Sequence, residues 1–268
     1  VTFHGIDLQI ERSINYGYRL NKKYDFLLKN TLKQIDKFTY ISDTIKNDLL
    51  ALGVHKDKLI YFPNSVNIEK FEKCSLSDLK KSKVLNLITV ARFAEKKKGL
   101  DLIESISANL IKKKVNFKWK IIGENINFLL QNSFYKTHNH LFDIINNIEN
   151  IDEEYFPHTD LIKHYKSSDL YVNLSRIESF GVTYIESLAS RVPIISFSGK
   201  GSDEIVKDKI NGILVNKDNI LDFADEICKI NGNKNIIDDM RDNCLNSIKK
   251  FDLDLNSKRL IDIYKKLN

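Results

Sequence analysis

The stretch LYVNLSRIESFGVTYIESLA, residues 170–189, decides the fold. Its first five residues are almost all apolar, as expected of a strand buried on both faces of a parallel sheet. A short polar loop follows, and a helix of apolar period begins near residue 182. The backbone N–H groups at this helix start point toward the carboxyl edge of the sheet, which predicts a phosphate-binding turn. The residues of this turn are Ser179, Phe180, Gly181 and Val182.

Two carboxylates flank the predicted phosphate turn. Glu178 lies in the loop before the helix, and Glu186 lies on the second helical turn. Negative charges beside a phosphate site repel the ligand unless each carboxylate meets hydroxyl groups, as in the binding of a ribose diol or a sugar. The pair therefore indicates a nucleotide that carries a sugar.

Strands and helices alternate on both sides of this stretch. Near-continuous apolar runs predict strands at 84–90, 119–122, 170–174, 193–197 and 212–215, with helices such as 99–112 between them. This alternation predicts an α/β fold with a doubly wound parallel sheet. Within 123–157 we expect one helix and one short strand near 148–151. Arg92 and Lys98 follow the strand 84–90 at the carboxyl edge of the sheet, which favours an anion-binding role, and Lys97 is an alternative to Lys98.

The first part of the chain repeats the pattern in shortened form. Strands are predicted at 1–3, 38–41 and 59–62, and a long polar helical stretch covers about 10–36. Three amphipathic helices are expected between 219 and 268. We divide the chain into an incomplete first domain at 1–75, a ligand-binding domain at 76–250, and a last helix at 251–268 that returns to the first domain.

The motifs resemble those of one enzyme family. The segment from Glu178 to Glu186 is similar to the E-x7-E motif of retaining glycosyltransferases with the GT-B fold, in particular glycosyltransferase family 4. The residues that follow, SLASRVPII, resemble the family motif EAmAcGxPVV. Further on, GSDEIV resembles the family motif GGxxEiV, and NGILV resembles nGxLV. Upstream, VARF and KGL resemble vGRl…KG, while FHG and PNSV resemble HG and PNGv. Alanine at 91 and serine at 65 and 190 replace the glycines that are usual in the family.

The resemblance implies two Rossmann-like domains and a set of roles. Arg92 and Lys98 would hold the diphosphate of a nucleoside diphosphate sugar, Glu186 its ribose, and Glu178 the transferred sugar. His4 would lie in the cleft near that sugar. The implied reaction transfers the sugar to a glycan or lipid-linked acceptor with retention of configuration. No cofactor and no metal are implied. The family's first domain exceeds a hundred residues, so we expect only its last part in this chain.

Composition narrows the function classes. The 268 residues include 42 Lys or Arg and 36 Asp or Glu, a net charge of +6 that suits a phosphorylated ligand or an anionic membrane better than nucleic acid. The three cysteines lack metal-ligand spacing and suggest a cytoplasmic protein with reduced thiols. The basic, aromatic segment from Arg12 to Lys37 suits either peripheral contact with the inner face of a membrane or an ordinary solvent-facing helix.

Two other functions remain open at this point. The chain has the features of a nucleotide-sugar-binding module without activity of its own, because an incomplete first domain does not present an acceptor. Another GT-B enzyme, such as a sugar-nucleotide epimerase or a phosphorylase, is the other alternative. A phosphorylase would require a lysine-bound cofactor site, and the sequence does not suggest one.

Overall fold

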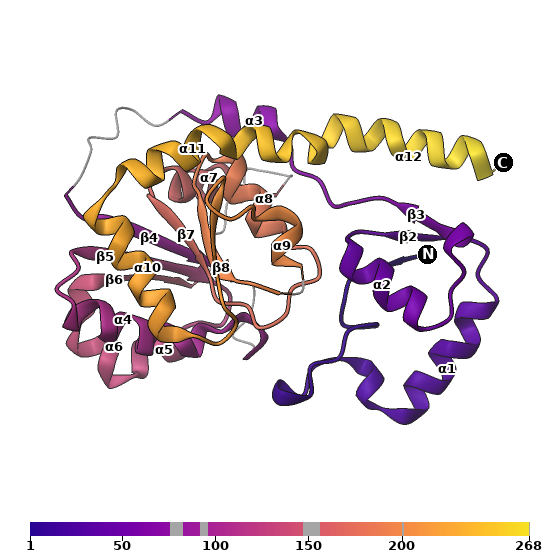
Figure 1. Cartoon of the computed structure of the whole chain (residues 1–268), viewed down its shortest axis with the longest axis horizontal. Coiled ribbons are helices and arrows are strands. Elements are labelled where there is room, and N and C mark those ends of the chain that lie inside the picture. Colours follow the sequence, from indigo (N-terminus) through magenta and orange to yellow (C-terminus); the bar gives the residue numbers. More distant parts are fainter. Residues whose placement is uncertain (76–82, 92–95, 147–155, 200, 268) are drawn as a thin grey trace.

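The computed structural model describes residues 1–75, 83–91, 96–146, 156–199 and 201–267. It contains two parallel sheets, one near each end of the molecule in Figure 1. The larger sheet has the strand order β6-β5-β4-β7-β8-β9. Its strands are β4 (Leu85–Val90), β5 (Phe117–Gly123), β6 (Phe142–Asn146), β7 (Leu170–Asn173), β8 (Ile194–Phe197) and β9 (Gly212–Val215). The predicted α/β class with a doubly wound parallel sheet is confirmed.

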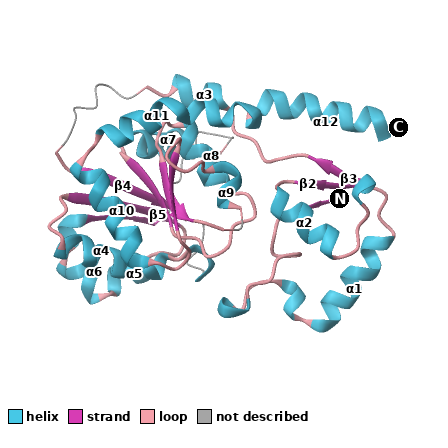
Figure 2. Ribbon diagram, viewed as in Figure 1, coloured by secondary structure: helices cyan, strands magenta, loops and turns pink. Residues whose placement is uncertain are grey.

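Helices cover both faces of the larger sheet (Figure 2). On one face, α4 (Ile103–Lys112) and α10 (Ile220–Gly232) pack on each other and share a core with the buried side chains of β5. On the other face, α8 (Val182–Ala189) packs against α11 (Asn235–Ile248), and α7 (Thr159–Lys166) lies nearby. The remaining short helices are α3 (Ile68–Lys73), α5 (Phe128–Gln131), α6 (Ser133–Thr137) and α9 (Ser202–Ile205).

The strand order reverses at β4. From β4 the chain proceeds to β5 and β6 on one side, and then crosses to β7, β8 and β9 on the other. Loops that leave neighbouring strands in opposite directions open a crevice at the carboxyl edge of the sheet. The crevice therefore lies at the ends of β4 and β7, where the predicted phosphate turn begins.

The first part of the chain forms the smaller sheet. Its order is β1 (Thr2–Phe3), β2 (Phe38–Tyr40) and β3 (Leu59–Tyr61), all parallel. The accompanying helices are α1 (Lys22–Lys33) and α2 (Asp43–Ala51). Among the residues described, these three strands are the whole of this sheet. Its core continues through Val66, Phe71 and Phe251 into the core under α8.

The predicted helix over 10–36 is wrong in its first half. Glu11 pairs with Tyr16 in an antiparallel bridge, and Gly17 adopts a φ of 110°, which a helix does not tolerate. The α-helix begins only after Asn21, whose side chain accepts hydrogen bonds from the backbone N–H groups of Lys23 and Tyr24. Two short 3-10 turns, Arg12–Ile14 and Tyr18–Leu20, occupy the rest of the segment.

The chain ends in the predicted three helices, α10, α11 and α12 (Leu253–Leu267). The last of them crosses from the larger sheet to the smaller one (Figure 1). Val66 and Asp252 form a parallel bridge at the crossing, and the amide of Asn256 donates to the carbonyl of Pro63 at 2.8 Å. No helix in the described ranges has both the length and the apolar character that a membrane span requires.

The segment 123–157 differs from its prediction. Two short helices, α5 and α6, replace the single helix expected, and the described strand β6 lies earlier in the chain than 148–151. That predicted strand and Arg92 both lie outside the described residues.

Candidate functional site

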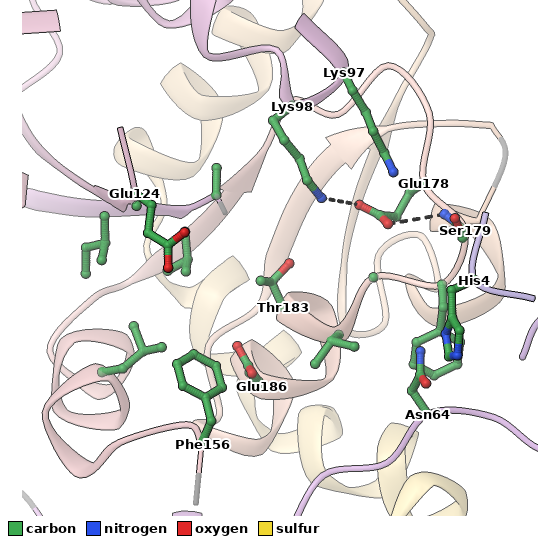
Figure 3. A pocket seen from close by; sticks show the side chains of 18 of the residues that line it. His4, Asn64, Lys97, Lys98, Glu124, Phe156, Glu178, Ser179, Thr183 and Glu186 are labelled. Atoms are coloured by element: carbon green, nitrogen blue, oxygen red, sulfur yellow. Dashed lines mark hydrogen bonds and ion pairs between the residues drawn. The ribbon is translucent and has the colours of Figure 1, made fainter. Parts of the chain in front are cut away.

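A pocket of about 670 Å³ opens between the two sheets, at the carboxyl ends of β4, β5 and β7 (Figure 3). Its wall from the first domain includes His4, Ile41 and Asn64. The wall from the larger sheet includes Lys97, Lys98, Glu124, Phe156, Glu178, Ser179, Phe180, Gly181, Val182, Thr183 and Glu186. A volume of this size is typical of small-molecule sites, and its position is the one expected for a ligand of a doubly wound sheet.

The turn before α8 has the predicted form. Gly181 is the residue before the helix and has a φ of 85°, and a Cβ atom there would lie 2.2 Å from the Tyr184 ring. Glycine is therefore required for α8 to begin at Val182. The Phe180 side chain turns away into the core, where it packs edge-on against Phe251 with ring centroids 5.2 Å apart. What this turn offers a ligand in the pocket is mainly its backbone.

Glu178 and Lys98, which both line the pocket, form an ion pair. The Lys98 Nζ lies 2.9 Å from Glu178 Oε2, and the backbone N–H of Ser179 donates to Oε1 at 3.2 Å. Glu178 is only 7% exposed. Burial alone would raise the pKa of its carboxyl, but the charges of Lys98 and Lys97 hold the pKa below its ordinary value. The carboxylate is thus kept ionised inside the protein.

Glu186 has the opposite electrostatic setting. Its side chain is 2% exposed, and its Oε2 accepts a hydrogen bond from the Tyr165 hydroxyl at 3.1 Å. Burial raises the pKa of the Glu186 carboxyl to about 7, although the Tyr165 hydrogen bond works against the rise. The two glutamates of the E-x7-E motif therefore line one pocket in different protonation regimes.

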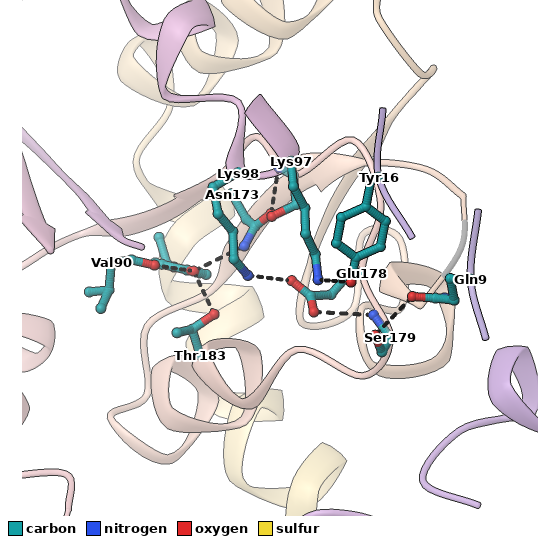
Figure 4. Close-up of polar contacts among 11 residues, drawn as sticks. Gln9, Tyr16, Val90, Lys97, Lys98, Asn173, Glu178, Ser179 and Thr183 are labelled. Carbon is teal, nitrogen blue, oxygen red and sulfur yellow. Dashed lines mark hydrogen bonds and ion pairs between the residues drawn. The ribbon is translucent and has the colours of Figure 1, made fainter. Parts of the chain in front are cut away.

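Side chains from the first domain contact residues that line this pocket (Figure 4). Lys97 Nζ donates to the Tyr16 hydroxyl at 2.9 Å and lies over the same ring, 4.6 Å from its centroid. Ser179 Oγ donates to Gln9 Oε1 at 2.9 Å. Gly5 packs so closely here that a Cβ atom would lie 2.0 Å from Ser179 Oγ. The turn before α8 is therefore in direct contact with the first domain through Ser179.

A second polar contact joins the domains at α2. The Glu204 carboxylate accepts from the backbone N–H groups of Asp43 and Thr44, at 2.8 and 2.9 Å. An acidic side chain at the amino end of a helix is favourable because it satisfies unpaired N–H groups and opposes the helix dipole. The carboxylate from α9 of the larger domain thus caps a helix of the smaller one.

The structure brings most of the predicted residues to one place. His4, Lys98, Glu178, the turn 179–182 and Glu186 all line the pocket, and His4 contributes from the first domain as expected. Sequence reasoning missed Asn64, Glu124 and Phe156, whose side chains also line the pocket. Asn64 follows β3 and Glu124 follows β5, so their positions just after strands were the available signal.

Among the residues described, no group of three or more His, Cys, Asp or Glu side chains is arranged to hold a metal ion. Among the described residues of the pocket, the lysines carry the positive charge. Lys97 and Lys98 belong to a 3-10 turn, Lys96–Lys98, that follows β4 in the chain, and both side chains point toward Glu178 in Figure 3.

Comparisons with known proteins agree with this geometry. An uncharacterised 41.2 kDa protein of the Klebsiella pneumoniae cps region is 26% identical over 205 residues, which are 73% of this chain and 52% of that protein. The alpha-monoglucosyldiacylglycerol synthase of Acholeplasma laidlawii is 25% identical over 225 residues, or 78% of this chain and 53% of the enzyme. The chain thus spans about half the length of these relatives.

Solved structures share the fold. A glycosyltransferase from Rickettsia africae superposes with a TM-score of 0.74 at 21% identity, covering 99% of this chain and 69% of that one. Anabaena HepE, solved in complex with UDP and glucose, superposes with a TM-score of 0.75 at 12% identity, covering 99% and 71%. These neighbours have the GT-B fold, which confirms the predicted architecture.

The family model described as glycosyl transferases group 1 matches residues 72–251, which include the larger sheet and the residues contributed by that domain to the pocket. This chain belongs to the glycosyl transferases group 1 family.

Proposed function

We propose that the protein is a retaining glycosyltransferase that moves a sugar from a nucleoside diphosphate donor to a glycan or lipid-linked acceptor. One observation carries the proposal. A single interdomain pocket combines a helix amino end, two lysines and two buried glutamates. The lysines and backbone N–H groups suit a diphosphate, and the carboxylates suit hydroxyl groups of ribose and sugar.

Each residue has a defined role in this proposal. Lys98, with Lys97 beside it, neutralises the charge that develops on the diphosphate as it leaves, and the N–H groups before α8 add to this stabilisation. Arg92, outside the described residues, is proposed to act with them. Glu186 accepts hydrogen bonds from the ribose, and Glu178 orients the sugar. His4 faces the sugar from the opposite wall of the pocket.

The proposed chemistry uses no metal and no protein nucleophile. The bond between the sugar C1 and the diphosphate oxygen breaks, and the acceptor hydroxyl oxygen bonds to C1 on the same face. The hydroxyl proton passes to the departing diphosphate, so atoms and charge balance. The protein's part is to hold donor and acceptor together and to stabilise the leaving group.

We also propose peripheral contact with an anionic membrane through the exposed side of α1. Phe26 is 67% exposed and Leu27 63% exposed, and Lys22, Lys23 and Lys33 are exposed on the same helix. Exposed apolar residues ringed by lysines suit an interface with anionic lipids. Sedimentation with phosphatidylglycerol vesicles should be reduced by the double substitution F26S and L27S. The same result with F128S, which changes an exposed side chain of the larger domain, would contradict this assignment.

The proposed reaction is tested by incubating the protein with UDP-glucose, UDP-galactose, UDP-N-acetylglucosamine or GDP-mannose in the presence of EDTA. We expect at least one donor to be cleaved to nucleoside diphosphate, with NMR showing that the released or transferred sugar first has the donor's anomeric configuration. An inverted product would refute retention. Activity lost in EDTA and restored only by Mn²⁺ or Mg²⁺ would refute metal independence. Binding without any cleavage would favour the inactive binding module.

A further inference from the structure

Tyr165 lies behind the pocket wall, on α7. Its side chain is fully buried, and its hydroxyl donates to Glu186 Oε2 at 3.1 Å. Tyr165 does not itself line the pocket, whereas Glu186 does. A ligand in the pocket would therefore meet the carboxylate but not the phenol. Any effect of Tyr165 on the ligand has to act through Glu186.

Packing holds the Tyr165 ring in place. It contacts the Tyr171 ring edge-on, with centroids 5.8 Å apart, and Tyr171 in turn contacts Tyr184 at 6.2 Å. The Tyr171 hydroxyl has its own partners, since it lies 2.8 Å from Thr183 Oγ1 and 3.0 Å from Asn173 Nδ2. Because this packing restricts the Tyr165 ring, its hydroxyl can point in only a few directions. In the structure it points to the Glu186 carboxylate.

The hydrogen bond also acts on the charge of Glu186. Burial favours the neutral carboxyl, and a phenolic donor favours the carboxylate, because it stabilises the negative charge. In the described part of the chain, the titratable groups near Glu186 are Tyr165 from α7 and Tyr171 from β7, and burial raises the pKa of both above the ordinary value. Further round the pocket lie the charged or titratable side chains of His4, Lys97, Lys98, Glu124 and Glu178.

We propose that Tyr165 is a positioning residue for donor binding: it holds one oxygen of Glu186 and favours the ionised carboxylate, so that the other oxygen accepts from the ribose hydroxyls of the donor. This inference rests on the proposed function, because it takes the ligand to be a nucleoside diphosphate sugar. A neutral carboxyl carries a proton on one oxygen, so that oxygen donates a hydrogen bond. The neutral group therefore accepts hydrogen bonds from the two ribose hydroxyls less well than a carboxylate does. Donor affinity should therefore fall as the solution becomes more acidic, and Tyr165 should set where it falls.

The test measures the affinity of UDP-glucose and GDP-mannose by calorimetry between about pH 6 and pH 8.5. The diphosphate of these two donors is esterified at both ends and keeps a constant charge over this range, so the ligand itself does not titrate. For a carboxyl that is half ionised near neutral pH, the parent should lose about tenfold in affinity from pH 8 to pH 6. In Y165F the midpoint of this affinity loss should shift to a pH about one unit higher. The variant should then bind the donor about fivefold more weakly than the parent at pH 7 and less than twofold more weakly at pH 8.

Two further variants separate this role from a structural one. Y135F removes another buried tyrosine hydroxyl, on α6 and away from this pocket, and should leave the profile unchanged. E186Q cannot ionise at this position, so its donor affinity should be weak and nearly independent of pH, and this result is informative even if Y165F folds poorly.

The outcomes are distinct. A Y165F deficit of equal size at every pH would mean that Tyr165 only supports the packing, and the inference would be wrong. An E186Q protein with the parent's pH profile would also overturn it. If the parent binds no donor at any pH, the proposed function itself has failed.

Discussion

Replacing Lys98 with methionine tests the electrostatics of the pocket most sharply. The change keeps most of the aliphatic volume but removes the charge 2.9 Å from Glu178 Oε2. Glu178 is 7% exposed, so its carboxylate would be left with the Ser179 N–H and the more distant Lys97. Breaking a buried ion pair from one side typically costs 3–5 kcal/mol, and the 20% exposure of the Lys98 side chain favours the lower end, about 3 kcal/mol at neutral pH.

The cost should depend on pH with a definite sign. The pair holds the pKa of Glu178 below its ordinary value of 4.5, so its stabilisation is present above that value and is lost as the pH falls through the lowered pKa. The K98M variant should therefore lose most of its deficit relative to the parent in acid. Adding E178Q to K98M should restore stability at neutral pH, because no unpaired charge remains, but should not restore donor binding.

The assay is urea unfolding followed by the fluorescence of Trp119, the only tryptophan, which is buried in β5 of the same domain. The matched control is K113M. Lys113 pairs with Asp225 at 2.8 Å, but both side chains are more than 40% exposed, so solvent screens the pair and its loss should matter little. If K98M destabilises the domain no more than K113M, the pair is not a buried electrostatic contact and the reasoning is refuted.

Three other perturbations follow from the structure. The pKa of Glu186 is raised from 4.5 to about 7, so the folded state binds this proton more tightly than the unfolded state does. The free energy of unfolding should therefore fall by about 3 kcal/mol as the pH rises through that interval. E186Q should abolish this contribution, and a variant whose stability depends on pH as the parent's does would contradict it. E204A removes the interdomain cap of α2 and should weaken that helix by about 1 kcal/mol. Amide hydrogen exchange in α2 should become faster, while unfolding followed by Trp119 fluorescence should not change. Equal effects on α2 exchange and on Trp119 unfolding would argue against a local cap. G5A places a Cβ atom 2.0 Å from Ser179 Oγ, on a residue whose φ is 131°. The substitution should therefore displace the first domain from the phosphate turn and weaken donor binding. A G5A protein that binds the donor as tightly as the parent would show that this contact is dispensable.

The fold of the larger domain was predictable because its strands are buried on both faces. Gly212 to Val215 is apolar throughout, and Ile194 to Phe197 is apolar except for Ser196. All four residues of β8 are buried, as expected of a strand covered on both faces. In β5 the prediction began two residues late, because the exposed Lys118 interrupts the apolar run. The wrong helix prediction in the first half of 10–36 also has a local cause. The polar pattern is compatible with a helix, but the positive φ of Gly17 and the bridge between Glu11 and Tyr16 exclude one there.

The site was predictable where its residues are close in sequence. Glu178, the phosphate turn and Glu186 lie within nine consecutive residues, so their spacing on a strand, loop and helix already fixes their arrangement. Tyr16, Tyr165 and Glu204 reach their partners from distant segments, 81, 21 and about 160 residues away. The contacts of Tyr16 and Glu204 depend on how the first domain packs on the larger one, and that of Tyr165 depends on how α7 packs beside α8. Periodicity and motif spacing do not specify either kind of packing.

The central claim is that this pocket binds a nucleoside diphosphate sugar through the buried glutamate of α8. Calorimetry with the same panel of uridine and guanosine diphosphate sugars tests it directly, using the parent, E186A, and E72A as an exposed control on α3. We predict that at least one donor binds the parent and E72A alike, and that E186A binds it more weakly by about 1.5–3 kcal/mol, the scale of hydrogen bonds to a charged group. A folded E186A protein that binds the donor as tightly as the parent, or a parent that binds none of the panel, would contradict the account.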